Sequence, residues 1–252
     1  MIRVGVIGAA GRMGRAVAHA VVADPDLELA ALIDPSHAGM TIEGVGVVAS
    51  MEALIDAGTE VAIEFTRPQA APANITWCIE HGLHVVTGTT GFEPDSAWGT
   101  QEAVGVLIAP NFAIGAVLMQ RFAEQAVRYL PDAEIIELHH QDKPDAPSGT
   151  AMATARRMAA SRGDVPAERR EERVPGARGA DVDGIRVHSV RLPGLVAHQE
   201  VILGAQGQTL RIRHDSTDWT SFMPGVLMAV KAVALRPGLT VGLDALLGYE
   251  QG

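Results

Sequence analysis

Residues 2–14 read Ile-Arg-Val-Gly-Val-Ile-Gly-Ala-Ala-Gly-Arg-Met-Gly, a largely apolar run that leads directly into closely spaced glycines. The apolar part predicts a strand and the glycines predict a tight turn, and residues 15–23 have the composition of a helix. A second apolar strand at 27–33 ends immediately before Asp34, which lies 20 positions after the last glycine. This order of strand, glycine turn, helix, strand and acidic residue predicts a Rossmann-like, dinucleotide-binding unit.

The glycine turn and the acidic residue have separate roles in such a unit. Glycines allow the backbone to approach a pyrophosphate, and the N-terminus of the following helix supplies N–H donors. Asp34 would accept hydrogen bonds from the ribose hydroxyls. The predicted cofactor contacts here are Gly8, Ala9, Ala10, Gly11, Arg12, Met13 and Asp34. The glycine spacing alone is a weak signal, and a tight turn without a ligand is the alternative.

Asp34 also bears on which dinucleotide is bound. A carboxylate repels a 2′-phosphate, Pro35 follows it, and His37 is the only basic residue close by in the sequence. NADH is therefore favoured over NADPH. Arg12 and Arg15 keep NADPH open, because either can bind phosphate, although both also fit as solvated residues at a helix start.

Further strands and helices continue the alternation. Strands are predicted at 61–65, 84–87 and 104–109, and helices at 51–57 and 69–81. The pattern implies an α/β fold whose parallel sheet is covered on both faces, with ligands beyond the carboxyl ends of its strands. Two of these ends are expected to border the nicotinamide through Gly88, Thr89, Thr90, Ala109, Pro110, Asn111 and Phe112. Ordinary turn chemistry is the alternative for each.

The stretch 137–150 combines several groups that suit an anionic ligand and proton transfer. A strand is predicted at 133–138, so His139 and His140 lie at its end, and Lys143 follows in a loop broken by prolines. A helix start comes next, where backbone N–H groups bind anions, and the residues that open this helix are Ser148, Gly149 and Thr150. Imidazole and ammonium groups beside such a helix start suit proton transfer to a bound anion.

Each of these groups also has a plainer interpretation. The two histidines can satisfy buried backbone groups, Lys143 can be a surface lysine, and Ser148 can be only an N-cap. Zinc binding by His139 and His140 is disfavoured, because adjacent strand residues point to opposite faces and no cysteine or acidic partner has ligand spacing. No metal is expected.

The rest of the chain predicts a second domain of α+β type. Helices are predicted at 114–129, 151–160 and 222–235, and strands at 185–192, 198–203 and 208–214. The turn at 204–207 indicates an antiparallel hairpin, and the outer face of this layer is expected to bury against other subunits. The stretch 162–183 is polar, and its charge run at 168–173 is interpreted as solvated surface.

The bulk composition narrows the class of protein. The 252 residues are 47% hydrophobic and 20% charged, which is typical of globular domains. A net charge of −10 argues against nucleic-acid binding, and no apolar run is long enough to span a membrane. The N-terminus favours a strand over a signal peptide. Cys78 is the only cysteine, so no intrachain disulfide forms and a cytoplasmic location is expected.

Four motifs occur together in a recognisable order. They are Gly-Ala-Ala-Gly-Arg-Met-Gly at 8–14, Gly-Thr-Thr-Gly at 88–91, Ala-Pro-Asn-Phe at 109–112 and Glu-Leu-His-His-x-x-Lys-x-Asp-Ala-Pro-Ser-Gly-Thr at 137–150. Together they resemble the 4-hydroxy-tetrahydrodipicolinate reductase family over essentially the whole chain. The stretches 175–184 and 195–200 resemble most closely the actinobacterial branch.

The resemblance implies a fold and an assembly. It implies a dinucleotide-binding domain at 1–113 with 222–252, and a substrate-binding and tetramerisation domain with a mixed sheet at 114–221. It further implies a homotetramer, NADH or NADPH as cofactor, and a small cyclic imine dicarboxylate that is reduced with loss of water in lysine biosynthesis through diaminopimelate.

The resemblance also implies roles for individual residues. His139 would be the catalytic acid or base and Lys143 a proton donor, and the division of the proton-transfer step between them stays open. Substrate binding is expected from His140, Lys143, Ser148, Gly149 and Thr150. Pro35 departs from the arginine that NADPH-dependent members often carry after the acidic residue.

Two other functions compete with this one. One is a different two-domain dehydrogenase, acting on a semialdehyde or a sugar; an acylating enzyme would need a cysteine nucleophile, and Cys78 on an apolar helix face is poorly placed for that. The other is a nucleotide-sensing regulator, which would need a DNA-binding element and a basic patch that the sequence lacks.

Overall fold

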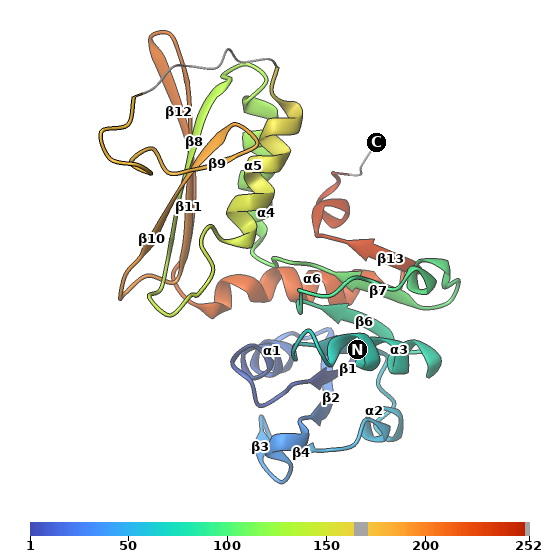
Figure 1. Ribbon diagram of the computed structural model, residues 1–252. Helices are drawn as coiled ribbons and strands as arrows, with labels where there is room; N and C mark the ends of the chain where they lie inside the picture. Colours follow the sequence, from blue (N-terminus) through green and yellow to red (C-terminus); the bar gives the residue numbers. More distant parts are fainter. Residues whose placement is uncertain (164–170, 250–252) are drawn as a thin grey trace. The chain divides into compact units, whose positions relative to one another are not determined.

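The computed structural model describes residues 1–163 and 171–249. The chain divides into two units, unit 1 with Met1–Ile114 and Phe222–Gly252, and unit 2 with Gly115–Ser221 (Figure 1). Each unit has its own sheet and its own hydrophobic core, so each is described by itself.

Within the described residues, unit 1 holds an eight-stranded sheet of order β13-β7-β6-β5-β1-β2-β4-β3. All neighbouring pairs are parallel except β3 with β4. The strands are β1 Ile2–Ile7, β2 Leu27–Ile33, β3 Thr41–Ile42, β4 Val45–Val48, β5 Val61–Glu64, β6 His84–Thr87, β7 Gly105–Ile108 and β13 Gly238–Val241. This is the predicted Rossmann-like sheet.

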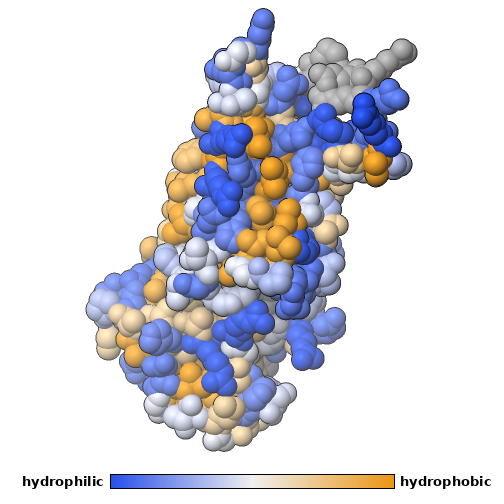
Figure 2. All heavy atoms as spheres, turned by 90° about the vertical axis from the view of Figure 1, so that its left-hand side faces the viewer, coloured by the Kyte–Doolittle hydropathy of each residue, from blue (hydrophilic) through white to orange (hydrophobic). Residues whose placement is uncertain are grey.

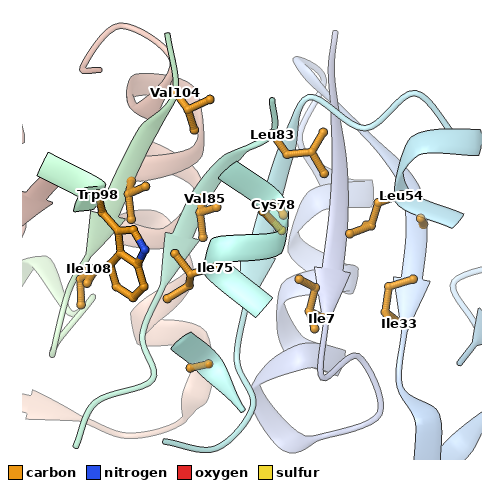
Figure 3. Close-up of a cluster of buried hydrophobic side chains, with 14 residues drawn as sticks. Ile7, Ile33, Leu54, Ile75, Cys78, Leu83, Val85, Trp98, Val104 and Ile108 are labelled. Carbon is orange, nitrogen blue, oxygen red and sulfur yellow. The ribbon is translucent and has the colours of Figure 1, made fainter. Parts of the chain in front are cut away.

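Helices cover both faces of this sheet. They are α1 Arg12–Ala23, α2 Glu52–Asp56, α3 Ala71–Glu80 and α6 Met223–Val233. On one face, Leu54 of α2 lies beside Ile33 of β2, and Ile75 of α3 lies beside Val85 of β6, as Figure 3 shows. On the other face lie α1 and α6, which pack against each other and against the strands. The strands are therefore apolar on both sides, as the sequence pattern predicted.

Two elements of unit 1 were missed in the sequence. The β3–β4 hairpin turns through Glu43 and Gly44, which both have positive φ, but its strands are too short for a periodic pattern to show. Strand β13, Gly238–Val241, follows the predicted helix at 222–235, and its four residues are too few to show a strand pattern. Helix α1 also begins at Arg12, three residues earlier than predicted.

In the described part of unit 2, the strands form a five-stranded mixed sheet of order β12-β11-β8-β10-β9. Its elements are α4 Ile114–Ala126, β8 Asp132–His139, α5 Gly149–Ser161, β9 Ala180–Val182, β10 Ile185–Arg191, β11 Ala197–Ala205 and β12 Gln208–Ser216. Strand β8 pairs parallel with β10 and antiparallel with β11. The predicted hairpin is β11–β12, with Gly207 in its turn.

One face of this sheet packs against α4 and α5, whose buried side chains include Met119 and Met158. The other face carries half-buried apolar side chains between charged ones. The apolar ones are Ile136, Leu138, Val190 and Ile202. Figure 2 looks onto this side of the molecule and shows hydrophobic and hydrophilic surface interleaved on it.

The polar stretch 162–183 contains β9, a three-residue strand that is too short for its pattern to show in the sequence. Of the predicted charge run, 168–170 lies outside the described residues. Across the part of the chain that the structure describes, no helix is long and apolar enough to cross a membrane.

Candidate active site

The glycine turn of unit 1 has no space for side chains at two of its glycines. Gly8 has a φ of +82°, and a Cβ there would lie 2.4 Å from the carbonyl oxygen of Phe65. A Cβ on Gly14 would lie 2.2 Å from the carbonyl oxygen of Gly8. Gly11 is the N-cap of α1, so no side chain competes for the backbone donors of the first helical turn. This tight cradle fits a pyrophosphate.

Asp34 is joined directly to the glycine turn. Its Oδ2 accepts a hydrogen bond from the Ala10 N–H at 3.1 Å, and its Oδ1 accepts from the Ser36 N–H at 3.1 Å and contacts His37 Nδ1 at 3.0 Å. Burial alone would raise the pKa of Asp34, but the hydrogen bonds from His37 and Ala10 outweigh it and lower the pKa. The carboxylate is therefore ionised at neutral pH, as hydrogen bonding to ribose hydroxyls requires.

The ends of β6 and β7 come together around aromatic rings. A Cβ on Gly88 would lie 2.3 Å from the ring of Phe65 and 3.0 Å from the ring of Phe112. These two rings meet edge to face with centroids 5.9 Å apart. Gly88 follows β6 and Phe112 follows β7. The two strand ends that are expected to border the nicotinamide are therefore neighbours in the structure.

The predicted cofactor residues differ in exposure. Gly11, Arg12, Thr90 and Pro110 are exposed; Gly8, Ala10, Met13, Asp34, Gly88 and Asn111 are half-buried; Ala9, Thr89, Ala109 and Phe112 are buried. The exposed and half-buried ones border the strand ends and the helix start. The buried ones hold the turns in place, and direct contact with a ligand stays a prediction for all of them.

A buried carboxylate beneath these turns was not predicted. Glu64, at the end of β5, is completely buried and accepts hydrogen bonds from the hydroxyls of Thr66 and Thr87, the latter at 2.8 Å. Thr87 Oγ1 in turn accepts from the Thr89 N–H at 3.1 Å, and Thr89 Oγ1 accepts from the Thr66 N–H at 3.1 Å. The available signal was an acidic residue within the apolar strand at 61–65.

In unit 2, His139 is the last residue of β8 and Glu137 lies on the same face of that strand. Glu137 is completely buried, and His139 Nδ1 contacts its Oε2. Arg191, at the end of β10, makes a bidentate pair with Glu137, with Nη1 to Oε2 at 3.0 Å and Nη2 to Oε1 at 2.9 Å. His140 follows the strand and is half-buried. The strand-end location of both histidines is thus confirmed.

Lys143 lies in the loop after β8, as predicted. Its Nζ is 2.7 Å from Asp145 Oδ1, and its side chain is 24% exposed, so it can exchange this partner for a ligand anion. The Lys143 N–H donates to the carbonyl of His140 at 3.2 Å, which closes a turn between them. One loop therefore presents an imidazole and an ammonium close in sequence.

Helix α5 begins where the sequence predicted. Ser148 is its N-cap, and its Oγ accepts from the Ala151 N–H at 3.2 Å. Gly149 is exposed, and a Cβ there would meet no atom within 4 Å. The backbone N–H groups of Gly149 and Thr150 lie in the first turn of α5, and N–H groups in this position of a helix bind carboxylates. Ser148 itself is 2% exposed, so its visible role is capping.

A buried network of hydrogen bonds holds the first turn of α5 in place. Thr154 Oγ1 donates to the Thr150 carbonyl at 2.8 Å and accepts from Gln199 Nε2 at 2.8 Å and Gln120 Nε2 at 3.1 Å. Gln120 Nε2 also lies 3.3 Å from the Thr150 carbonyl. All three side chains are buried, so the first turn of α5 is held rigidly.

A hollow of about 680 Å³ on unit 1 contains none of the predicted site residues. It is lined by Pro72, Ala73, Thr76, Trp77, Glu80, Glu93, Asp95 and Trp98. Among residues 1–163 and 171–249, no group of three His, Cys, Asp or Glu residues is arranged to hold a metal ion. The candidate site therefore rests on the strand ends and helix starts described above.

Comparison with known proteins decides which family this is. Residues 2–112 match the family model for the dihydrodipicolinate reductase N-terminus, and residues 115–247 match the model for its C-terminus. The chain belongs to the dihydrodipicolinate reductase family. Its relatives include the 4-hydroxy-tetrahydrodipicolinate reductases of Nocardia farcinica, 52% identical over 98% of both chains, and of Cutibacterium acnes, 49% identical over 99% and 100%.

A solved structure from the same family agrees, and a more distant one shares the fold. A dihydrodipicolinate reductase from Paenisporosarcina sp. TG-14, with dipicolinate bound, is 38% identical, with a TM-score of 0.85 over 97% of this chain and 99% of that one. A myo-inositol dehydrogenase from Corynebacterium glutamicum, 16% identical with a TM-score of 0.58 over 94% and 90%, shares the fold alone. Family membership thus identifies an oxidoreductase and removes the regulator from consideration.

The cysteine-dependent alternative also fails on chemistry. Cys78 lies in α3 with no exposed surface, and burial raises the pKa of its thiol to about 12. A thiol in this environment does not form a thiolate nucleophile at neutral pH. The reductase chemistry must therefore come from groups other than cysteine.

Proposed function

We propose that this chain reduces 4-hydroxy-tetrahydrodipicolinate to tetrahydrodipicolinate with loss of water, using NADH or NADPH, in lysine biosynthesis through diaminopimelate. The observation that carries the proposal is the content of segment 137–150, which presents an imidazole, an ammonium and a helix N-terminus in one stretch. The half-identical relatives and the structural relative with bound dipicolinate support a cyclic dicarboxylate as substrate.

Binding of the dicarboxylate is assigned to the positive groups of this segment. His140 and the Lys143 ammonium would hold one carboxylate, and the N–H groups of Gly149 and Thr150 would hold the other at the start of α5. Ser148 would act mainly by capping that helix, since its hydroxyl accepts from Ala151. Lys143 would leave Asp145 when the substrate arrives.

Reduction follows from loss of the hydroxyl as water, which leaves a C=C bond conjugated to the ring imine. When bound, the reduced nicotinamide supplies a hydride to C4 of the ring. His139 or Lys143 then provides the proton that C3 receives, since both groups carry exchangeable protons at neutral pH. The residues of the chain thus bind, orient and protonate.

The cofactor would lie along the strand ends of unit 1. The glycine turn with Arg12 and Met13 would face the pyrophosphate, Asp34 the ribose, and residues 88–90 and 109–112 the nicotinamide. NADH is proposed as the preferred cofactor, because Asp34 is ionised and its basic neighbour, His37, already contacts that carboxylate. Arg12 and Arg15 keep NADPH usable.

Assembly and location complete the proposal. The half-buried apolar side chains on the outer sheet face of unit 2 support a homotetramer that pairs through this face. Domain 114–221 would then serve both substrate binding and assembly. A cytoplasmic location fits the free, buried Cys78. Light scattering of the purified chain measures the subunit number, and a monomer would contradict this part.

The reaction is tested by a coupled assay. The upstream synthase converts pyruvate and aspartate semialdehyde into the substrate, and loss of nicotinamide absorbance is followed with NADH and NADPH in parallel. Consumption that depends on the synthase is expected, faster with NADH. A folded chain that binds dinucleotide but consumes neither cofactor would overturn the substrate assignment while leaving unit 1 as proposed.

A further inference from the structure

The side chain of Glu137 is a buried charge that the proposed reaction does not use. It lies on the inner face of β8, has no exposed surface, and follows Ile135 on the same side of the strand. Burial alone would raise the pKa of Glu137, but the hydrogen bonds from His139 and Arg191 outweigh it and hold the pKa at about 2. Glu137 is therefore a carboxylate, and only an acceptor, throughout the neutral range.

Arg191 contacts two separate parts of the candidate site. Besides its bidentate pair with Glu137, its Nη2 donates to the carbonyl of Asp145 at 2.5 Å. Strands β8 and β10 run parallel with Arg191 opposite His139, so the guanidinium is delivered to the end of β8 by strand register. It therefore links the strand that carries His139 to the loop that carries Lys143.

The pairing with Glu137 also determines which nitrogen of His139 carries a proton. Since the carboxylate only accepts, Nδ1 must donate to it, and in the neutral ring Nε2 is then the acceptor. Nε2 has no hydrogen-bonding partner among residues 1–163 and 171–249. A ligand proton would thus be exchanged at Nε2, with Nδ1 held in place.

We propose that Glu137 and Arg191 are positioning residues for both proton-transfer groups. Glu137 fixes the ring and tautomer of His139, and Arg191 holds Glu137 in place while fixing the backbone at Asp145, two residues from Lys143. The catalytic roles of His139 and Lys143 rest on the proposed function, whereas the arrangement around Glu137 rests on the contacts alone.

A purely structural role is the competing explanation, because a buried ion pair often does little more than satisfy its own charges. The chain offers a matched control for it. Glu134, on the opposite face of β8, contacts His188 Nε2 at 2.8 Å and Arg178, so it forms the same trio of residue types outside segment 137–150. A purely structural role predicts that Glu137→Gln lowers stability more than Glu134→Gln, because Glu137 is completely buried and the Glu134 side chain is 33% exposed. It also predicts that neither substitution lowers kcat of the folded chain.

The first measurement needs no substrate. Long-range ¹H–¹⁵N correlation spectra of the wild-type chain report the tautomer of each histidine, and the His139→Gln variant identifies the His139 signals. For the neutral ring the Nδ1–H form is expected, and it should be lost in Glu137→Gln. An Nε2–H form in the wild type would overturn the proposal without any variant having to fold.

The second measurement uses turnover in the coupled assay. Glu137→Gln is expected to lower kcat by about 10²-fold, within the range that a positioned acid or base contributes, with the KM for dinucleotide unchanged. Glu134→Gln should stay within about twofold of wild type when light scattering shows its subunit number unchanged, because its partners His188 and Arg178 lie outside segment 137–150. Arg191→Lys, which keeps the charge but not the bidentate fork, should fall between them.

The outcomes distinguish a failure of the positioning role from a failure of the proposed function. Equal kcat values for Glu137→Gln and Glu134→Gln would overturn the positioning role. A wild-type chain with the Nδ1–H form but without turnover would contradict the proposed function and would still support the arrangement around Glu137.

Discussion

Among residues 1–163 and 171–249, each unit buries one glutamate near a strand end, and the two differ in what surrounds them. Glu64 in unit 1 is satisfied by neutral donors, namely the hydroxyls of Thr66 and Thr87. Glu137 in unit 2 is satisfied by Arg191 and His139. Neutral donors fix only the geometry of a turn, whereas a guanidinium and an imidazole also determine where protons reside.

The difference matches the chemistry proposed for each unit. The turns that Glu64 stabilises would hold a cofactor that itself supplies the hydride. The protein there needs only to keep these turns, and the hydrogen bonds they offer, in a fixed geometry. The segment beside Glu137 would move a proton, so the protein there needs a defined protonation site. Both glutamates are equally buried, and the partners alone separate the two cases.

The largest effect is expected at the group that Glu137 serves. His139→Gln should lower kcat by about 10²–10⁴-fold, because a positioned acid or base contributes that much, and should leave dinucleotide affinity unchanged. Steady-state assays with saturating NADH and fluorescence titration of the dinucleotide measure the two quantities. If dinucleotide affinity fell together with kcat, the separation of roles between the units would be wrong.

The next largest effect concerns stability and the charge on Arg191. Arg191→Met removes the partner of a buried carboxylate and should lower the free energy of unfolding by about 3–5 kcal/mol. Arg3→Met is the control: Arg3 pairs with Glu28 at 3.7 Å in unit 1 with its side chain 44% exposed, so its loss should cost less than about 1 kcal/mol. Urea unfolding of both variants checks this, and equal losses would show that the burial of Glu137 carries no electrostatic cost.

Acid should act on the same pair. The pKa of Glu137 in the folded chain, about 2, lies below its ordinary value of 4.5, so ionised Glu137 stabilises the fold above pH 4.5. This contribution, on the order of 2–3 kcal/mol, is lost as the pH falls from about 4.5 toward 2. The difference in unfolding free energy between wild type and Glu137→Gln should therefore shrink over that range, and a constant difference would contradict the depressed pKa.

The sequence predicted those parts of the site that depend on neighbours in the chain. The glycine turn, the strand end at His139 and the N-cap at Ser148 follow from short patterns, and the structure confirms their locations. Arg191 could not be found in this way, because its contact with Glu137 joins residues 54 positions apart through a parallel pairing that no local pattern specifies. The predicted roles of the site residues remain predictions.

The fold shows the same division between local and distant information. The apolar pattern of the long strands β1 and β2 predicted them from the sequence, whereas the two residues of β3 are too few to show a strand pattern. Glu64 was visible as an acidic residue in an apolar strand, but its hydrogen-bond donors were not, because Thr66 and Thr87 reach it from two separate strand ends.

The smallest effect is expected at the neutral donors to Glu64, the hydroxyls of Thr66 and Thr87. It tests whether these donors contribute to stability and to cofactor binding. Thr87→Val removes one donor to Glu64 and the acceptor of the Thr89 N–H, which should cost about 1–3 kcal/mol of stability. It should also raise the KM for dinucleotide and leave kcat unchanged, because the turn at Thr89 loses its anchor.

Thr59→Val is the matched control: Thr59 is 6% exposed, and its Oγ1 has no hydrogen-bonding partner within the described part of the chain. Its replacement should be neutral or stabilising, since no bond is lost and a buried polar atom is removed. If Thr87→Val proved as harmless as Thr59→Val, the hydroxyls around Glu64 would be incidental, and the comparison would reduce to the single charged pair in unit 2.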